Sequence, residues 1–452
     1  MFENIIAQAA AGQLREDILS HRLAPSMLFY GPAASGKGSS AMETARALSC
    51  ENGAAPWDCA CSACARHRAL LHPDLAMIGS RGFAAEIAAS RAAFLRDTAS
   101  VPGRSLFIRS LRRLLARFAP AVWEYEAKSS RANPLPLLQL LEEELDDFER
   151  RAGGQLAEES AALEKRAETL VKNAFKLEDE CISEFVPIAQ VRKAAYWSRL
   201  SPSGNRKTLI IENADRMKEE ARNSLLKLLE EPPESICIIL TTQRRESVIP
   251  TVLSRLRPYR FHNRTAAEER EIIRRVFRAP GEAPETESGE GVASLVGKYL
   301  DSFLPQPPDK LLPLAAFFIA AVARSAAARA KSLGASGISP ALGALGGHCS
   351  PIAEAAGLRR SSQAGETINA LLSGSGNFEG RSFPRFLSLV LDLVSSSMKE
   401  AGSVQPACSE IWKKRLGEAQ AACGVWNQSC GLALESLFYR LREDLAVRGT
   451  AA

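Results

Sequence analysis

The chain has 452 residues, enough for two to four domains, and 46% of them are hydrophobic, which is ample for buried cores. The formal net charge is only +5 and the mean hydropathy is −0.10, values typical of a soluble protein. This charge is compatible with a DNA-handling complex but disfavours a simple DNA-binding protein. The apolar run Leu311–Val322 is too short to cross a membrane, so we expect a buried helix there and no membrane partner.

The first motif in the chain is a glycine-rich loop between a strand and a helix. Ser26–Tyr30 predicts a strand, GPAASGKGS follows at 31–39, and an alanine-rich helix comes next. In this context the pattern predicts a phosphate loop, whose backbone N–H groups cradle phosphates and whose lysine reaches the terminal ones. The candidate nucleotide-binding residues here are Gly31, Ser35, Gly36, Lys37, Gly38 and Ser39.

One position of this loop departs from the pattern. The residue after the lysine is normally Ser or Thr, whose hydroxyl ligates Mg²⁺, but here it is Gly38. Ser39 comes one residue late, which turns its side chain away by roughly 100° on a helix. The loop therefore lacks one expected metal ligand.

Four cysteines follow the loop, with the spacing C-x8-C-x-C-x2-C. Cys50, Cys59, Cys61 and Cys64 can surround a tetrahedral Zn²⁺ as four thiolates. No signal peptide begins the sequence, so disulfides are not expected. Because a CxC step is tighter than the usual CxxC, His67 is an alternative ligand.

Residues 208–256 predict two buried parallel strands with a helix between them. Thr208–Ile211 is apolar and β-rich and ends on Glu212, so it presents a carboxylate where α/β sheets bind ligands. A helix over 216–231 stops at a pair of prolines, and Ile236–Leu240 is the next strand. Polar Thr242 lies at the tip of that strand. The order strand, helix, strand implies a parallel sheet.

Residues 83–182 predict helices. Two apolar stripes on either side of Gly153-Gly154 indicate an antiparallel helical hairpin; they consist of Leu138, Leu141, Leu145 and Phe148, and of Leu156, Leu163, Leu170 and Leu177. Upstream, several arginines accompany leucines, namely Arg104, Arg109, Arg112, Arg113 and Arg117. Such a helix either contacts phosphates or keeps its charges in water, and the second interpretation is favoured.

In their residues and in their order along the chain, these motifs resemble those of the bacterial DNA polymerase III clamp-loader subunits of the gamma/tau and delta-prime type. The resemblance is specific over residues 1–82 and 183–262. It rests on Ile5-Ile6-Ala7-Gln8, the phosphate loop, the four-cysteine segment, His72-Pro73-Asp74, Val191-Arg192, Leu225–Pro233 and Ser254-Arg255.

The resemblance implies an α/β AAA+ core, with a parallel sheet and helices on both faces. The core would occupy residues 1–262, including a structural zinc module at 50–64 and a helical insertion at 83–182. A small helical lid is expected at 263–307, and a helical collar that oligomerises the subunits at 308–452.

The resemblance also implies a function. Family members form a hetero-pentameric ring in the cytoplasm that opens a sliding clamp and places it on primer-template DNA. An arginine of the family's Ser-Arg-Cys motif reaches the ATP of the neighbouring subunit, and Arg255 matches it, although Leu256 replaces the cysteine.

The acidic end of the second family strand is altered in this chain. A working site ends in Asp-Glu, whereas Glu212-Asn213 stands here: Glu212 can still hold a cation, but Asn213 cannot act as a base. These departures and Gly38 predict no intrinsic ATPase and argue against binding of ATP and Mg²⁺. A damaged pocket with a retained arginine resembles the delta-prime role. The alternatives are an ATP-hydrolysing gamma/tau subunit, or an interaction protein outside replication on a decayed AAA+ scaffold.

Overall fold

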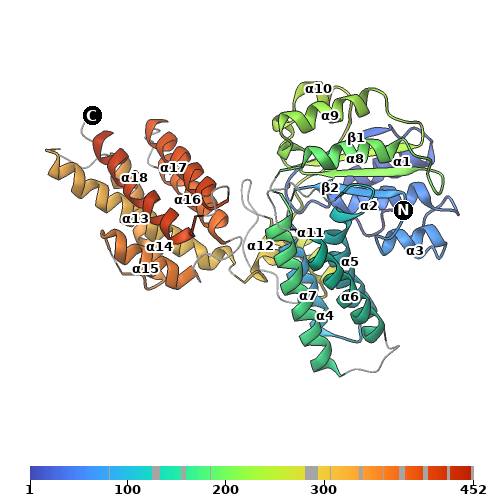
Figure 1. The fold of residues 1–452 in the computed structure, drawn as a ribbon, viewed down its shortest axis with the longest axis horizontal. Coiled ribbons are helices and arrows are strands. Elements are labelled where there is room, and N and C mark those ends of the chain that lie inside the picture. The colour runs from blue at the N-terminus through green and yellow to red at the C-terminus, as the bar shows by residue number, and fades with distance from the viewer. Residues whose placement is uncertain are drawn as a thin grey trace. The chain divides into compact units, whose positions relative to one another are not determined.

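A computed structural model describes most of the chain, and it divides into two compact units, Met1–Leu304 and Pro305–Ala452 (Figure 1). The described residues are 1–80, 82–124, 133–153, 159–183, 185–279, 294–305, 307–334, 340–359, 361–375, 382–400, 406–424 and 428–448. Each unit has its own core and is treated by itself below.

A five-stranded parallel sheet forms the centre of the first unit, in the order β2-β3-β4-β1-β5. Leu28 pairs with Leu240 and Ile210 with Ile239, so the apolar middles of the strands lie in register. The predicted parallel α/β core is thereby confirmed. The strands are β1 (Ser26–Tyr30), β2 (Leu75–Gly79), β3 (Lys207–Glu212), β4 (Ile236–Thr242) and β5 (Arg257–Arg260).

Both faces of the sheet are covered, because alternate strand residues point into different cores. On β3, Ile210 faces the core shared with α1 (Ala9–Leu19) and α2 (Lys37–Ser49). Its neighbours Leu209 and Ile211 face the core shared with α8 (Ile188–Ser198) and α9 (Glu219–Glu230). Figure 1 shows α8 and α9 on the side of the sheet away from α2. The helix predicted over 216–231 begins later, after a 3-10 turn at Ala214–Arg216.

Four helices between β2 and β3 share a separate core. They are α4 (Ala84–Arg96), α5 (Val101–Leu115), α6 (Leu135–Ala152) and α7 (Ser160–Cys181), and a 3-10 turn, η1 (Ala116–Phe118), follows α5. Phe148 meets Phe94 and Phe107 edge to face at the centre of this core. As the two stripes predict, α6 packs on α7; Leu156 lies outside the described residues.

Two short helices follow the sheet, α11 (Ala266–Val276) and α12 (Leu295–Ser302). A capping box, in which Thr265 and Glu268 satisfy each other's backbone N–H groups, fixes the start of α11. Ile273 and Phe277 pack with Tyr299 against Ala89 and Ala93 of α4. The lid assignment of this segment stays a prediction.

The second unit is helical in its described residues. Its helices are α13 (Pro308–Ser332), α14 (Pro340–Ala355), α15 (Ala364–Ser375), α16 (Ser382–Glu400), α17 (Pro406–Gly424) and α18 (Cys430–Arg448). The run Leu311–Val322 lies in α13 and is almost wholly buried, as predicted. The expectation that this apolar segment is too short to cross a membrane was wrong, because the helix Asp309–Ser332 is long and apolar enough to do so. However, 72% of the apolar window of this helix is buried inside the protein, as in a core helix.

Candidate nucleotide site and cysteine cluster

The phosphate loop joins β1 to α2 as predicted, and Gly36 adopts the left-handed conformation (φ 91°) that lets α2 begin at Lys37. Ser35 Oγ donates to Pro32 O at 2.8 Å, while Ser39 is exposed on the helix. The local geometry therefore follows the sequence pattern, including its missing hydroxyl at Gly38.

Lys37 folds back over its own loop. Its ammonium group donates to Gly31 O at 2.8 Å, to Pro32 O, and to Ser35 Oγ at 3.2 Å, so all three N–H donors have partners. Burial, together with the nearby Arg264 guanidinium, lowers the pKa of Lys37 to about 8, and Asp215 only partly opposes this. The lysine is thus tied to the loop rather than extended from it.

Arg264 is a site residue that the sequence did not reveal. It lies just before α11, is buried, and donates from Nη1 to Ala34 O and from Nε to Ile6 O, both at 2.9 Å. A Cβ atom on Gly36 would lie 3.0 Å from its Nη2 atom. No local pattern marks this arginine, because its contacts are with residues more than 200 positions away in the chain.

The distal end of the site differs from the expected arrangement. Both carboxylate oxygens of Glu212 accept hydrogen bonds from arginines, one from Arg113 and one from Arg117. Burial raises the pKa of Glu212, but the two adjacent guanidinium groups outweigh this and hold it below its usual value. Each oxygen of Glu212 thus accepts from one guanidinium group, and the expectation that Glu212 could hold a metal cation stays a prediction.

The expectation for the arginine-rich helix was wrong. Arg109 and Arg112 donate to backbone carbonyls of the segment after the cysteines, at Arg68 O (2.5 Å) and Ala69 O (3.3 Å). Arg113 and Arg117 turn into the protein, and Arg104 donates to Ala152 O. These charges are therefore paired within the protein rather than left in water, and α5 packs against α4, α6 and α7.

Asn213 and Thr242, the further candidate nucleotide-binding residues that the sequence offers at the strand ends, form local contacts. Asn213 has a left-handed conformation (φ 55°) and donates to Ser80 Oγ at 2.9 Å, so it lies at the tips of β2 and β3. Thr242 donates to Asp215 Oδ1 at 2.7 Å. The structure thus gathers Lys37, Glu212 and Thr242 at the carboxyl ends of the parallel strands, as the sequence predicts.

Arg255 lies apart, directly after the short helix α10 (Pro250–Leu253). Its guanidinium donates to Glu230 Oε1 of α9 at 2.7 Å and to Thr251 O at 2.6 Å. The Arg255 and Glu230 side chains are 33% and 49% exposed. The ion pair is therefore a surface one, of the kind that contributes about 0–1 kcal/mol.

The four predicted cysteines converge. The Sγ atoms of Cys50, Cys59, Cys61 and Cys64 all lie within 4.8 Å of one another, and the Cys50–Cys59 distance is 3.8 Å. Tetrahedral Zn²⁺ with Zn–S bonds of about 2.3 Å requires sulfur–sulfur separations of roughly 3.8 Å, so this donor set fits a four-thiolate ion.

His67 is not part of this cluster. It stacks on His72 with ring centroids 4.1 Å apart, and burial, with His72 beside it, lowers its pKa to about 3. The alternative in which His67 replaces a cysteine ligand is therefore not favoured.

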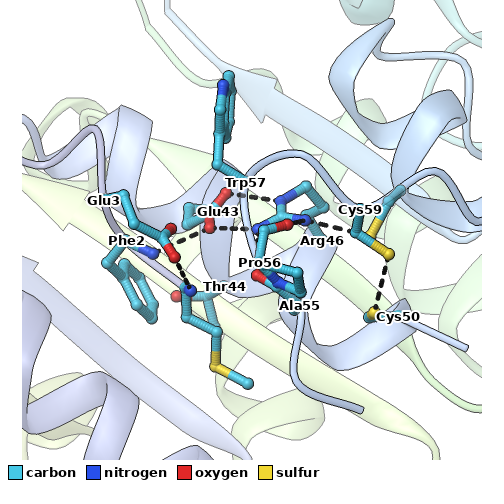
Figure 2. A network of polar contacts seen from close by, with 12 residues as sticks. Phe2, Glu3, Glu43, Thr44, Arg46, Cys50, Ala55, Pro56, Trp57 and Cys59 are labelled. Atoms are coloured by element: carbon cyan, nitrogen blue, oxygen red, sulfur yellow. Dashed lines mark hydrogen bonds and ion pairs between the residues drawn. The ribbon is translucent and has the colours of Figure 1, made fainter. Parts of the chain in front are cut away.

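A buried arginine on α2 joins the cysteine cluster to the start of the chain (Figure 2). Arg46 donates to Cys64 Sγ at 3.1 Å and to Ala55 O at 2.7 Å, and it forms a two-point ion pair with Glu43 at 2.6 and 2.8 Å. Glu43 also accepts a hydrogen bond from the Phe2 N–H at 3.0 Å. The cluster is thus anchored on the helix that follows the phosphate loop.

Fold and site together define a class of protein. A parallel sheet with a phosphate loop after β1, an acid at the end of β3 and Thr242 at the tip of β4 is the arrangement of an AAA+ core. The family model described as "DNA polymerase III, delta subunit" matches residues 6–118 and 157–265, just under half of the chain. These matches support a clamp-loader protein of the AAA+ type.

The chain is also similar to individual proteins, including the following two. "DNA polymerase III subunit delta'" of Bacillus subtilis (strain 168) is 35% identical over 65 residues, which are 14% of this chain and only 20% of that relative. A solved structure, a DNA polymerase III gamma subunit-related protein from Thermotoga maritima, is 19% identical; the match covers 58% of this chain and 80% of that one, with a TM-score of 0.24. The family match includes α4, α5 and α7 and leaves out residues 119–156, and the insertion expected at 83–182 stays a prediction.

Proposed function

We propose that this chain is a delta-prime-like subunit of a cytoplasmic DNA polymerase III clamp loader. It would occupy an outer place in a hetero-pentameric ring that opens a sliding clamp and places it on primer-template DNA. The observation that carries the proposal is the contrast between two sites. In the chain's own pocket Glu212 is paired with two arginines, whereas the Arg255 side chain is 33% exposed and forms a surface pair that a partner could displace.

Arg255 is suited to act on a neighbouring subunit. It follows α10 at the edge of the core, and its described contacts are with α9, α10 and Ser254 rather than with its own phosphate loop. A guanidinium is always charged and can bind two phosphate oxygens at once. Exchanging the weak Glu230 pair for a neighbour's phosphates therefore costs little.

We further propose that the four cysteines hold one structural Zn²⁺. All four coordination positions would be filled by Cys50, Cys59, Cys61 and Cys64, which leaves none for a reacting water. Zinc would stabilise the segment between α2 and β2. Arg46, which donates to Cys64, would offset part of the negative charge of four thiolates.

The experiment for the trans action of Arg255 is reconstitution of the loader with wild-type chain or with Arg255→Ala. The phosphate-loop lysines of the other ATP sites are replaced, so that only the site beside this chain turns over. We expect the ring to assemble and clamp- and DNA-stimulated hydrolysis to fall, by roughly 10³-fold if Arg255 acts as strongly as other arginine fingers. Arg274→Ala, which removes another surface arginine paired within its own chain, is the matched control and should leave turnover unchanged. Equal turnover with Arg255→Ala and wild type would refute the proposal.

A further inference from the structure

Two glycines open space beside the Glu212 carboxylate. A Cβ atom on Gly38 would lie 3.1 Å from Glu212 Oε1 and 3.2 Å from Arg113 Nη2. A Cβ atom on Gly79, at the end of β2, would lie 2.8 Å from the Glu212 carbonyl oxygen and 3.1 Å from Arg117 Nη2. Side chains at either position would press on the two guanidinium groups, so both glycines suit the arginines.

The two arginines reach this space from one side. Arg113 lies in the last turn of α5 and Arg117 four residues later in η1, and each donates Nη2 to a different oxygen of Glu212. The Arg117 side chain is 1% exposed and that of Glu212 is 8% exposed, so their ion pair is shielded from solvent. Arg113 also pairs with Glu86 of α4, and the Phe83 ring lies 5.8 Å from the Arg113 guanidinium and 5.2 Å from that of Arg117.

These contacts do not fit a bound Mg²⁺. The ion needs close to six oxygen ligands in octahedral geometry at about 2.1 Å, and in a phosphate-loop site it takes them from a hydroxyl, an acid and the phosphates. Here Gly38 supplies no hydroxyl, and both oxygens of Glu212 already accept from cations. A divalent ion at Glu212 would lie against two positive charges in a site with little water to screen them.

We propose that Arg113 is a built-in cation that takes the place of Mg²⁺ in this pocket, with Arg117 fixing the shared carboxylate. The pocket then excludes divalent metal, and the ion pair holds α5 against β3 whether or not nucleotide is present. This inference rests on the proposed delta-prime-like function, since it explains how such a subunit keeps a fixed core while its neighbours turn over ATP.

The test is ATP binding by the full chain, measured calorimetrically with Mg²⁺ and with a metal chelator. For the wild type we expect no gain in affinity from Mg²⁺. The double variant Gly38→Thr/Arg113→Ser restores a hydroxyl and removes the competing guanidinium, so its affinity should rise by about tenfold or more with Mg²⁺. Mn²⁺ bound together with ATP should then be detectable by electron paramagnetic resonance in the double variant and not in the wild type.

Arg112→Ser is the matched control, because Arg112 lies beside Arg113 on α5 but pairs with Glu149 of α6. It should behave like the wild type. If circular dichroism shows the double variant to be unfolded, Arg113→Ser alone, which adds no bulk beside Glu212, should show a smaller gain in the same direction.

Mg²⁺-dependent ATP binding by the wild type, or a folded variant that gains none, would overturn the inference. Neither result bears on Arg255, whose effect is measured at the neighbouring subunit. The two proposals can therefore fail separately.

Discussion

Glu212→Gln is the sharpest test of the buried ion-pair network. The substitution keeps the shape of the side chain but removes the charge that Arg113 and Arg117 share. Arg113 keeps Glu86, whereas within the described residues Glu212 is the ion-pair partner of Arg117, which is 1% exposed. Breaking a buried pair by removing one partner costs about 3–5 kcal/mol. Because the glutamine oxygen can still accept one hydrogen bond, we expect the lower end, about 3 kcal/mol.

The assay is urea unfolding of the full chain by circular dichroism, with limited proteolysis in parallel to assign the transition of the first unit, since two units need not unfold together. Glu230→Gln is the matched control, because it removes the same charge from a surface pair and should cost about 1 kcal/mol or less. Equal destabilisation by the two substitutions would refute the argument from burial.

The same comparison has a predicted pH dependence. The pKa of Glu212 is lowered below its usual 4.5, so the folded chain holds the carboxylate charged at a pH where the unfolded chain protonates it. The stabilisation is fully present above pH 4.5 and is lost as pH falls through the folded-state pKa. The difference between wild type and Glu212→Gln should therefore be largest near neutrality and shrink in acid. A difference that grows below that pH would mean that another group is responsible.

Three further outcomes are expected. The isolated chain should not hydrolyse ATP, and turnover of about 1 s⁻¹ or more would instead support a gamma/tau-like motor. Elemental analysis of chelator-washed protein should find one zinc per chain. Cys61→Ser should lower the melting temperature far more than Cys430→Ser, because Cys430 lies outside the cluster. An NMR titration of the Lys37 ε-carbon should give a pKa of about 8 rather than 10.5. Between these two values the unfolded chain binds the proton more strongly than the folded chain, so the contribution of Lys37 to the free energy of unfolding rises with pH. A midpoint near 10.5 would contradict the burial of this group.

Much of the site could be predicted from the sequence because its signals are local. The phosphate loop lies within nine residues, the cysteines within fifteen, and each strand carries its own apolar run and polar tip. Backbone geometry and helical or strand periodicity act over such distances, so spacing alone gathers these groups. The predicted parallel sheet and the converging cysteines are found in the structure.

Only the tertiary structure shows which side chains from distant parts of the chain line the pocket. Arg113 and Arg117 are nearly a hundred residues from Glu212 in the chain, and Arg264 is more than 200 residues from the loop it contacts. Helical periodicity shows that α5 has a charged face but not which surface that face meets, so water seemed its natural environment. From the sequence Gly38 was only a missing hydroxyl, whereas the fold shows that a side chain there would press on a guanidinium group. The sequence by itself thus indicated a clamp-loader protein whose phosphate loop lacks a hydroxyl, and only long-range packing decided that two arginines pair with Glu212 beside it.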